Sequence, residues 1–172
     1  LNIVSEQINE PIFSNNDTPQ ELQRVMPFSN EAEQSVLGAM YLDKECIPDV
    51  ISKVRSSDFY IDRHKELFET IVELFNLGKP VDLVTLEGQL TLRGSLQKIS
   101  GIKFVMEIAK TVPSTENVVY YAEIVKDKAV LRSLIKLADK ISSAAYRGDE
   151  ETDEILAKAQ QGIIEITQDR ES

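Results

Sequence analysis

The sequence predicts an all-α protein, a small globular helical bundle followed by a long antiparallel helical hairpin. Leu, Ile, Ala, Glu and Lys dominate the chain, and only 7 Gly and 6 Pro interrupt it, a composition that favours helix. The β-branched residues do not form runs of period two, so we expect no substantial sheet. The last third repeats apolar residues at alternating spacings of three and four, which is typical of amphipathic helices.

Composition and charge limit the functional classes. The chain has 172 residues and a net charge of -10, and the negative excess is spread along it. Without a basic stripe, the chain alone is a poor electrostatic match to nucleic acid. The single cysteine, Cys46, cannot form an intramolecular disulfide or a zinc site, and it fits a cytoplasmic location. No apolar run approaches the ~20 residues that span a bilayer, and residues 1–22 lack the features of a signal peptide.

Residues 1–26 carry polar side chains and two prolines without a clear period, so we expect a mostly irregular N-terminal arm. The first helix begins after it. Ser29 or Asn30 can accept hydrogen bonds from the amides of the first turn, and Glu31 and Glu33 lie near the positive end of the helix dipole. Gly38 in mid-helix costs about 1 kcal/mol relative to Ala. We therefore expect another helix to approach closely at Gly38.

Four more short helices complete the predicted globular part, residues 27–113. A short helix covers 47–54, and the next begins near Asp62, with the most apolar face of the chain, and ends at Gly78. Asp82 caps a helix that ends at Gly94, and the last begins near Ser100. Pro113 marks the boundary, after which Ser114 is expected to cap the long helix.

The hairpin is predicted over residues 114–168, with the loop at 147–151. The first rod, if unbroken, would be roughly 50 Å long. Two apolar stripes are expected to meet and close the hairpin: Leu131, Leu134, Ala138, Ile141 and Ala145 on the first rod, and Leu156, Ala159, Ile163 and Ile166 on the second. A second stripe on the first rod carries Val130, Leu137 and Ala144. Together the two stripes form a face wider than one partner helix covers.

Catalytic and metal-binding constellations are not recognisable. His64, the only histidine, lies beside Asp62 and Arg63 and is expected on a solvated first turn; Cys46 is expected to be a small buried side chain. The chain carries no glycine-rich phosphate loop. Gly148 with its following acids could suggest a cation loop, but a helix C-cap before an acidic first turn explains it better. Tyr120 and Tyr121 could stack on bases, yet packing on the bundle is the better account. We therefore expect a docking module, not an enzyme.

The chain resembles one family over residues 27–168, on motifs that follow each other in order. Residues 27–38 match the pattern P-x-S-x-E-A-E-Q-S-V-L-G, with which the N-terminal domain of the bacterial replicative DNA helicase of the DnaB type opens. The later matches are Asp58-Phe59-Tyr60, His64, Leu67-Phe68, residues 78–86, Leu92-Arg93-Gly94, residues 112–117 and residues 121–125. One departure lies at residues 99–102, where the family often carries a glycine pair.

This resemblance implies a function that periodicity does not show. The family's protein is a ring-shaped hexamer that unwinds DNA at the fork with ATP and Mg²⁺. This chain resembles its N-terminal domain alone, with residues 169–172 starting a linker to a motor domain beyond Ser172. No cofactor is therefore expected in this part, and DNA would be met only through the full-length ring. In the family these domains form a collar, a trimer of dimers, on which primase docks; a helicase loader is a further possible partner, and no membrane is involved.

The resemblance and the stripes together predict two sets of residues. Partner binding is expected at Leu131, Ile135, Ile155 and Leu156, near the open end of the hairpin. The oligomer interface is expected at Val130, Leu134, Leu137, Ile141, Ala144 and Ile163. For each residue the alternative is packing within the chain's own bundle. The alternative for the whole chain is a stand-alone helical adaptor or regulator; an acidic nucleic-acid mimic has little support because the charge is dispersed.

Overall fold

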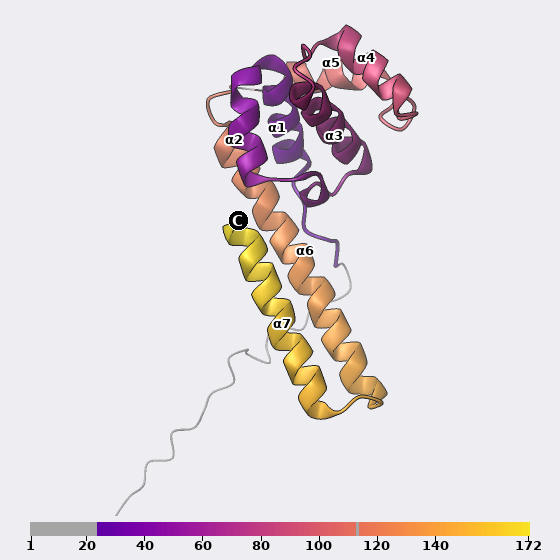
Figure 1. Ribbon diagram of the computed structural model, residues 1–172, viewed down its shortest axis with the longest axis vertical. Coiled ribbons are helices and arrows are strands. Elements are labelled where there is room, and N and C mark those ends of the chain that lie inside the picture. Colours follow the sequence, from indigo (N-terminus) through magenta and orange to yellow (C-terminus); the bar gives the residue numbers. More distant parts are fainter. Residues whose placement is uncertain (1–23, 113) are drawn as a thin grey trace, which may run out of the picture.

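The protein consists of a helical head and a long helical hairpin (Figure 1). The structure is a computed structural model that describes residues 24–112 and 114–172. All regular secondary structure in these two ranges is helical, which confirms the all-α prediction. Residues 1–23 of the predicted N-terminal arm lie outside the described residues. The helices are α1 (Asn30–Leu42), α2 (Ile47–Lys53), α3 (Asp62–Asn76), α4 (Leu83–Leu92), α5 (Ile102–Thr111), α6 (Val118–Arg147) and α7 (Thr152–Glu171), with 3-10 helices η2 (Lys44–Cys46) and η3 (Ser56–Asp58).

Helix α1 forms the centre of the head. The Ser29 Oγ accepts a hydrogen bond from the Ala32 amide at 3.1 Å and caps the helix as predicted. Val36, Leu37 and Met40 are fully buried against the surrounding helices. At Gly38 the chain around α5 comes so close that an added Cβ would lie 2.1 Å from Val112 Cγ2 and 3.2 Å from the Ile108 carbonyl oxygen. The predicted close approach at this glycine is therefore confirmed.

The turns of the head follow local sequence signals. Gly78 has a φ of 68° and ends α3, a backbone conformation that costs a glycine little. Asp82 then starts α4 with a reciprocal capping box, in which its carboxylate accepts from the Thr85 amide at 2.9 Å. Ser100 also has a positive φ, 66°. It lies where the resembled family often carries glycine. Ser100 therefore places a side chain at a left-handed backbone position, which disfavours residues that have a Cβ.

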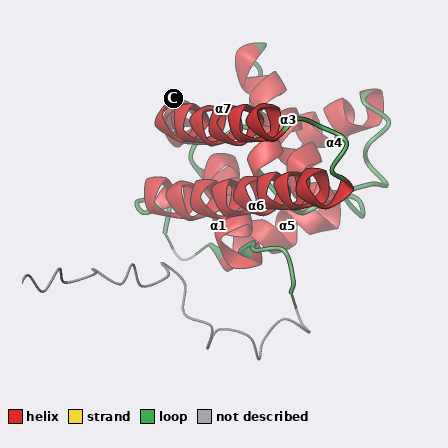
Figure 2. Ribbon diagram, turned by 90° about the horizontal axis from the view of Figure 1, so that it is seen from below, coloured by secondary structure: helices red, strands yellow, loops and turns green. Residues whose placement is uncertain are grey.

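The hairpin consists of α6 and α7, which lie side by side: α6 runs away from the head and α7 returns toward it (Figures 1 and 2). Helix α6 has 30 residues, and its first turns belong to the head, where Val118, Ala122 and Val125 are buried in the core. It begins at Val118 rather than near residue 115, because the Ser114 hydroxyl accepts from the Glu116 amide inside the preceding turn and caps no helix. A division at Pro113 and Ser114 into two domains stays a prediction.

The stripe predicted to close the hairpin is wrong for most of its members. Leu131, Leu134, Leu156 and Ile163 are 44%, 38%, 58% and 48% exposed. Three predicted members, Ile141, Ala159 and Ile166, are half-buried and lie in the seam between the two helices. The neighbouring stripe of α6 completes the seam: Val130 and Ala144 are buried, Leu137 is half-buried, and they face the side of α7 that carries Ile155 and Gly162. The reason lies at Gly162, which has no side chain and admits Leu137: a Cβ there would be 2.5 Å from Leu137 Cδ1.

The prediction for His64 is also wrong. It lies in the first turn of α3, as expected, but it is fully buried. Its Nδ1 lies 3.0 Å from Glu33 Oε1, and its ring stacks on Phe104 at a centroid distance of 5.6 Å. The Glu33 carboxylate also accepts from the Tyr60 amide at 3.2 Å; Nε2 of His64 has no hydrogen-bond partner among the described residues. The prediction relied on the charged sequence neighbours Asp62 and Arg63, whereas the groups that contact His64 come from α1 and α5.

Other single-residue expectations are confirmed or refined. Cys46 is buried, and burial raises the pKa of its thiol to about 11. Gly148 has a φ of 64° and ends α6, as expected for a C-cap. Tyr121 packs against the core, whereas Tyr120 remains 63% exposed. Within residues 24–112 and 114–172, no helix is long and apolar enough to cross a membrane.

Candidate interaction surface

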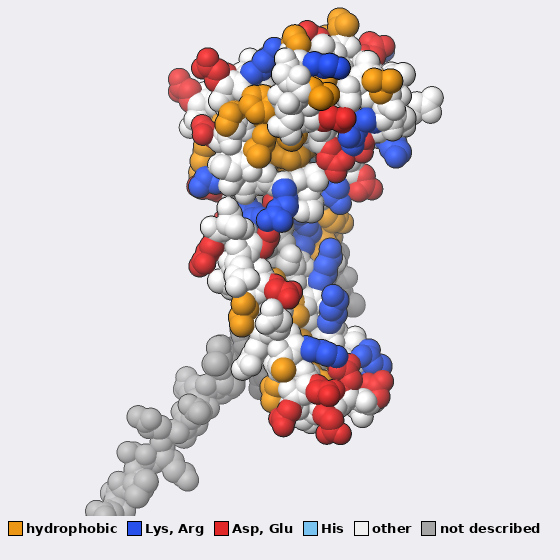
Figure 3. Space-filling model, viewed as in Figure 1, with side chains coloured by type: hydrophobic (Ala, Val, Ile, Leu, Met, Phe, Trp, Pro, Cys, Tyr) orange, Lys and Arg blue, Asp and Glu red, His pale blue; other side chains and the backbone are white. Residues whose placement is uncertain are grey.

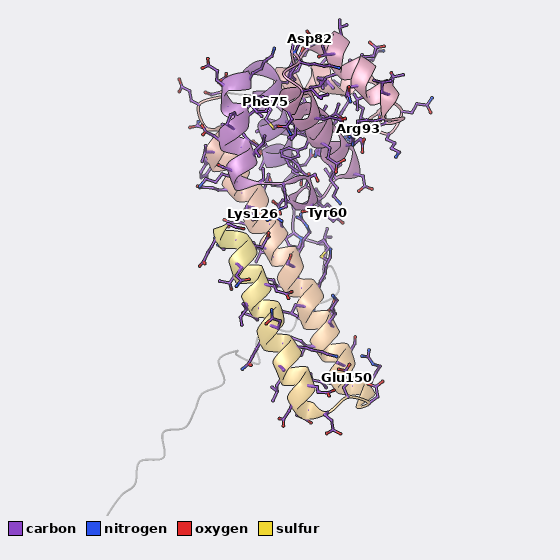
Figure 4. The ribbon with its side chains drawn as sticks, in the orientation of Figure 1. Tyr60, Phe75, Asp82, Arg93, Lys126 and Glu150 are labelled. Carbon is purple, nitrogen blue, oxygen red and sulfur yellow. The ribbon has the colours of Figure 1, made fainter. Side chains whose placement is uncertain are left out.

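Arg132 of α6 fastens the hairpin to the head. Its side chain is buried, and its two terminal nitrogens donate to the carbonyl oxygens of Pro27 at 2.8 Å and Asp58 at 2.6 Å. Its guanidinium lies 5.3 Å from the centre of the Tyr60 ring, which is labelled in Figure 4. Burial lowers the pKa of Arg132, although the nearby Glu33 carboxylate opposes the shift. One cation therefore links the start of the head to η3 and α6.

The end of α7 is fastened to the same region by ion pairs. Lys126 Nζ lies 3.2 Å from a carboxylate oxygen of Asp58 and 3.1 Å from one of Asp169, which connects η3, α6 and α7 (Figure 4). Arg55 adds a second contact to Asp169 at 2.6 Å. Helix α7 has no fully buried residue. Its position therefore depends on these charges and on the half-buried seam with α6.

The loop end of the hairpin is held by Glu150. This carboxylate pairs with Lys158 of α7 and with Arg147 of α6, the latter at 3.5 Å (Figure 4). The arrangement joins the two helix ends across the loop. No group of three or more His, Cys, Asp or Glu side chains within the described ranges is placed to hold a metal ion. The acidic residues here act as partners of basic side chains and as the first turn of α7.

One flank of the hairpin forms an exposed apolar surface, the hairpin apolar face, made of Leu131, Leu134, Leu156 and Ile163. At about 100° per residue the two α6 leucines share a flank with Asp127, and the two α7 residues share a flank with Arg170. Asp127 and Arg170 pair at 2.9 Å, so both flanks lie on the same side of the hairpin. These four exposed apolar side chains therefore lie along one side of the hairpin.

The opposite flank carries a groove with an apolar floor and polar borders. A depression of about 680 Å³ runs along the two helices; its floor includes Leu137, Ile141, Ala144 and Ile155 of the seam, and its borders carry Lys140 on α6 and Lys158, Gln161 and Glu165 on α7. Figure 3 shows Lys and Arg side chains in a row along α6 and acidic side chains gathered at the loop end. The hairpin therefore presents two chemically different sides.

The structure distributes the predicted site residues over these surfaces. Of the six expected at an oligomer interface, Val130, Leu137, Ile141 and Ala144 lie in the seam within the chain, whereas Leu134 and Ile163 are exposed on the hairpin apolar face. Of the four expected to bind a partner, Leu131, Ile135 and Leu156 are exposed and Ile155 is half-buried in the seam.

The four partner residues do not form one cluster. Because Leu137 lies against Gly162 in an antiparallel hairpin, Leu156 is level with about residue 143 of α6. It is therefore roughly 18 Å along the hairpin from Leu131 at 1.5 Å per residue. The anchors Lys126, Arg132 and Asp169 were missed by sequence reasoning. One signal could have identified Arg132: the helical period places this charged residue on the side of α6 that faces the head.

Sequence comparisons place the chain in a family. The model of the DnaB-like helicase N-terminal domain matches residues 25–127. The chain is similar to the replicative DNA helicase DnaB of Geobacillus stearothermophilus, with 38% identity over 87% of this chain and 33% of the relative. It is also similar to the replicative DNA helicase DnaB of Mycobacterium leprae, with 37% identity over 88% of this chain and 25% of the relative. The chain thus spans a quarter to a third of the length of these curated relatives.

Solved structures give the same assignment. The N-terminal domain of DnaB helicase from Mycobacterium tuberculosis superposes with a TM-score of 0.77 and 38% identity, over 81% of this chain and 99% of that one. The N-terminal domain of DnaB helicase from Helicobacter pylori, a structure described together with its interactions with primase, has a TM-score of 0.57 and 25% identity, over 67% of this chain and 90% of that one. The head, the hairpin and both comparisons lead to one conclusion: the chain belongs to the family of DnaB-like helicase N-terminal domains.

Proposed function

We propose that this chain is the assembly and primase-docking domain of a hexameric replicative DNA helicase. Family membership and the names of the relatives support this function over that of a stand-alone adaptor. The chain spans about a third of the relatives' length, so DNA unwinding, with ATP and Mg²⁺, is assigned to the rest of a longer protein. DNA is contacted through the complete ring, and a helicase loader is a further partner of that ring.

Self-association is assigned to Leu134 and Ile163 of the hairpin apolar face. Each large aliphatic side chain left in water forgoes roughly 1.5–3 kcal/mol of burial, and these two residues are 38% and 48% exposed in the single chain. A matching hairpin of a second copy would cover them and gain part of this energy. Val130, Leu137, Ile141 and Ala144 support the interface from the seam, because they hold the two helices at a fixed separation.

Primase docking is assigned to the flank of the hairpin that carries Ile135 and Leu156, which are 38% and 58% exposed. The relative from Helicobacter pylori supports this step, since its domain is described with its interactions with primase. Leu131 contributes directly on the same flank. Ile155 contributes by packing in the seam beneath Leu156.

The assembly proposal is tested by light scattering after size-exclusion chromatography over a range of concentrations. The unchanged chain should form dimers or larger species. The double variant Leu134→Ser and Ile163→Ser should shift toward monomer at the same concentration. Leu92→Ser is the matched control, because Leu92 is 81% exposed but lies on the head. A strict monomer for the unchanged chain, or the same shift in the control, refutes the assignment.

The docking proposal is tested separately with primase from the same organism. Ile135→Ala and Leu156→Ala should each weaken primase binding more than threefold in a titration by surface plasmon resonance, while far-ultraviolet circular dichroism shows an intact fold. Leu92→Ala serves as the control. A loss smaller than threefold in both variants contradicts the assignment of this flank, and no measurable binding of primase by the unchanged chain favours an adaptor without a role in replication.

A further inference from the structure

The end of α7, residues 167–172, is held by charged side chains and not by an apolar seam. Ile166 is the last apolar residue of the chain, and it is half-buried against α6. Every residue after it is polar or charged. In Figure 1 this end of α7 lies beside α6, just below the head. Its position there is therefore set by electrostatics more than by the burial of apolar surface.

Two side chains, Asp169 and Arg170, make the attachments. One carboxylate oxygen of Asp169 lies 2.6 Å from the Arg55 guanidinium of the head, and the other lies 3.1 Å from Lys126 Nζ of α6. Arg170 pairs with Asp127 of α6 at 2.9 Å. The side chains of Arg55, Asp169 and Arg170 are 61%, 41% and 54% exposed. Because exposed ion pairs contribute little net stability and are screened by salt, this attachment is weak and depends on ionic strength.

A polar depression separates the end of α7 from the end of α2. It has a volume of about 300 Å³, and each of its lining residues, which come from α2, α6 and residues 170–172, is polar or charged. Across it, Lys53 Nζ of α2 approaches the Glu123 carboxylate of α6 only to 4.0 Å. Since this side of α7 borders a polar space, moving the helix end away exposes little apolar surface and costs little hydrophobic free energy.

Release of the helix end leaves no buried charge without a partner. The Lys126 side chain is 11% exposed, and its Nζ also lies 3.2 Å from Asp58, whose side chain is 6% exposed. Lys126 therefore keeps one carboxylate when Asp169 leaves, and the penalty for an unpaired buried charge does not arise. Asp58 in turn accepts from the Arg55 amide at 2.9 Å, so η3 keeps its own hydrogen bond. The docked and the released arrangements are both electrostatically satisfied, as a two-state element requires.

We infer that residues 167–172 form an electrostatic latch that Asp169 holds closed, docked on α6 and the head at low ionic strength and released at high ionic strength. Release frees the end of α7 and opens the polar depression to solvent. The rest of the hairpin stays closed, because its seam consists of apolar side chains such as Leu137 and Ile155, and their burial does not depend on charge. The latch is a property of this chain by itself and does not depend on the proposed function.

The test is double electron–electron resonance on the complete chain, labelled at Ser57→Cys in η3 and Gln168→Cys on α7, both exposed positions. Burial raises the pKa of the Cys46 thiol to about 11, so a thiol-reactive nitroxide label does not react with it at neutral pH. Dilution with unlabelled chain removes distances between copies. Raising NaCl from about 10 mM to about 1 M, which shortens the Debye length from about 30 Å to about 3 Å, should at least double the fraction of molecules with a longer second distance.

A neutral variant separates the charge of Asp169 from other effects of salt. Asp169→Asn keeps the size of the side chain, so it should show the longer distance already at about 10 mM NaCl. The matched control is Glu165→Gln, at an exposed carboxylate one turn earlier on α7 that accepts from Gln161 of its own helix. It should leave the distances unchanged. A second label pair, Ser57→Cys with Gln160→Cys, follows the middle of α7 and should not respond to salt.

Three results overturn the latch. A single distance between positions 57 and 168 that neither salt nor Asp169→Asn changes means that the end of α7 is held rigidly. An equal change in Glu165→Gln assigns the effect to overall charge and not to Asp169. A change in the second label pair that parallels the first means that the whole hairpin opens, so the seam and not the latch responds to salt.

Discussion

Replacing Gly38 by alanine tests the contact on which the packing of α1 in the head depends. The added Cβ would lie 2.1 Å from Val112 Cγ2 and 3.2 Å from both the carbonyl oxygen and Cγ2 of Ile108. Ordinary carbon contacts are about 3.5–4.0 Å. Val112 is β-branched and changes its rotamer reluctantly, and the Ile108 carbonyl belongs to the backbone of α5. The methyl group can therefore be accommodated only if α1 and α5 move apart.

The magnitude follows from two opposing terms. Overpacking a well-packed core costs typically about 1–3 kcal/mol, and an overlap this severe belongs near the upper end. Alanine in a helix gains about 1 kcal/mol over glycine. The expected net effect of Gly38→Ala is a loss of about 2 kcal/mol, which corresponds to a fall in Tm of roughly 4–8 °C for a chain of this length.

The assay is urea unfolding followed by far-ultraviolet circular dichroism, with the midpoint compared at an unchanged slope. Gly88→Ala is the matched control, because Gly88 lies inside α4 and a Cβ there meets nothing within 4 Å. It should gain up to about 1 kcal/mol from helix propensity alone. Opposite signs for the two variants are the expected result. If Gly38→Ala is as stable as the unchanged chain, or both variants shift in the same direction, the account of the contact between α1 and α5 is refuted.

Three further predictions concern single side chains. Arg132→Met removes two hydrogen bonds from a buried cation, each worth about 1.5–3 kcal/mol, so urea unfolding should show that the free energy of unfolding falls by at least about 3 kcal/mol. The control Lys136→Met, at an exposed residue of the same helix, should change it by no more than about 0.5 kcal/mol. If Arg132→Met also changes it by less than about 0.5 kcal/mol, Arg132 is not an anchor of the hairpin. Ser100→Gly should raise stability by about 1 kcal/mol, since it relieves a left-handed backbone, and an unchanged or lower Tm contradicts this. The thiol of Cys46, with a pKa of about 11 against an ordinary 9.0, should react with iodoacetamide at least about 100-fold more slowly in the folded chain at pH 8 than in urea, because only the thiolate reacts; equal rates would contradict its burial.

The sequence by itself determined the existence and the ends of most helices. These depend on signals that act within one turn, such as the Ser29 cap, the pairing of Asp82 with Thr85 and the left-handed residue Gly148. A hydroxyl, a carboxylate or a missing Cβ exerts its effect on backbone groups a few residues away, so no knowledge of distant packing is needed. The all-α class, the head and the hairpin follow from adding up such local signals.

Only the tertiary structure decided which faces meet. Neighbouring stripes on a helix differ by about 100° of rotation, and periodicity alone assigned the closing of the hairpin to the stripe of Leu131 and Leu134, not to that of Val130 and Leu137. The absent side chain of Gly162 on the opposite helix selected Leu137 and left Leu134 exposed. His64 is buried because Glu33 lies 31 positions earlier in the sequence, on α1. The free energy of these contacts comes from the fit between surfaces that are distant in sequence, and that fit is defined only when the helices are packed.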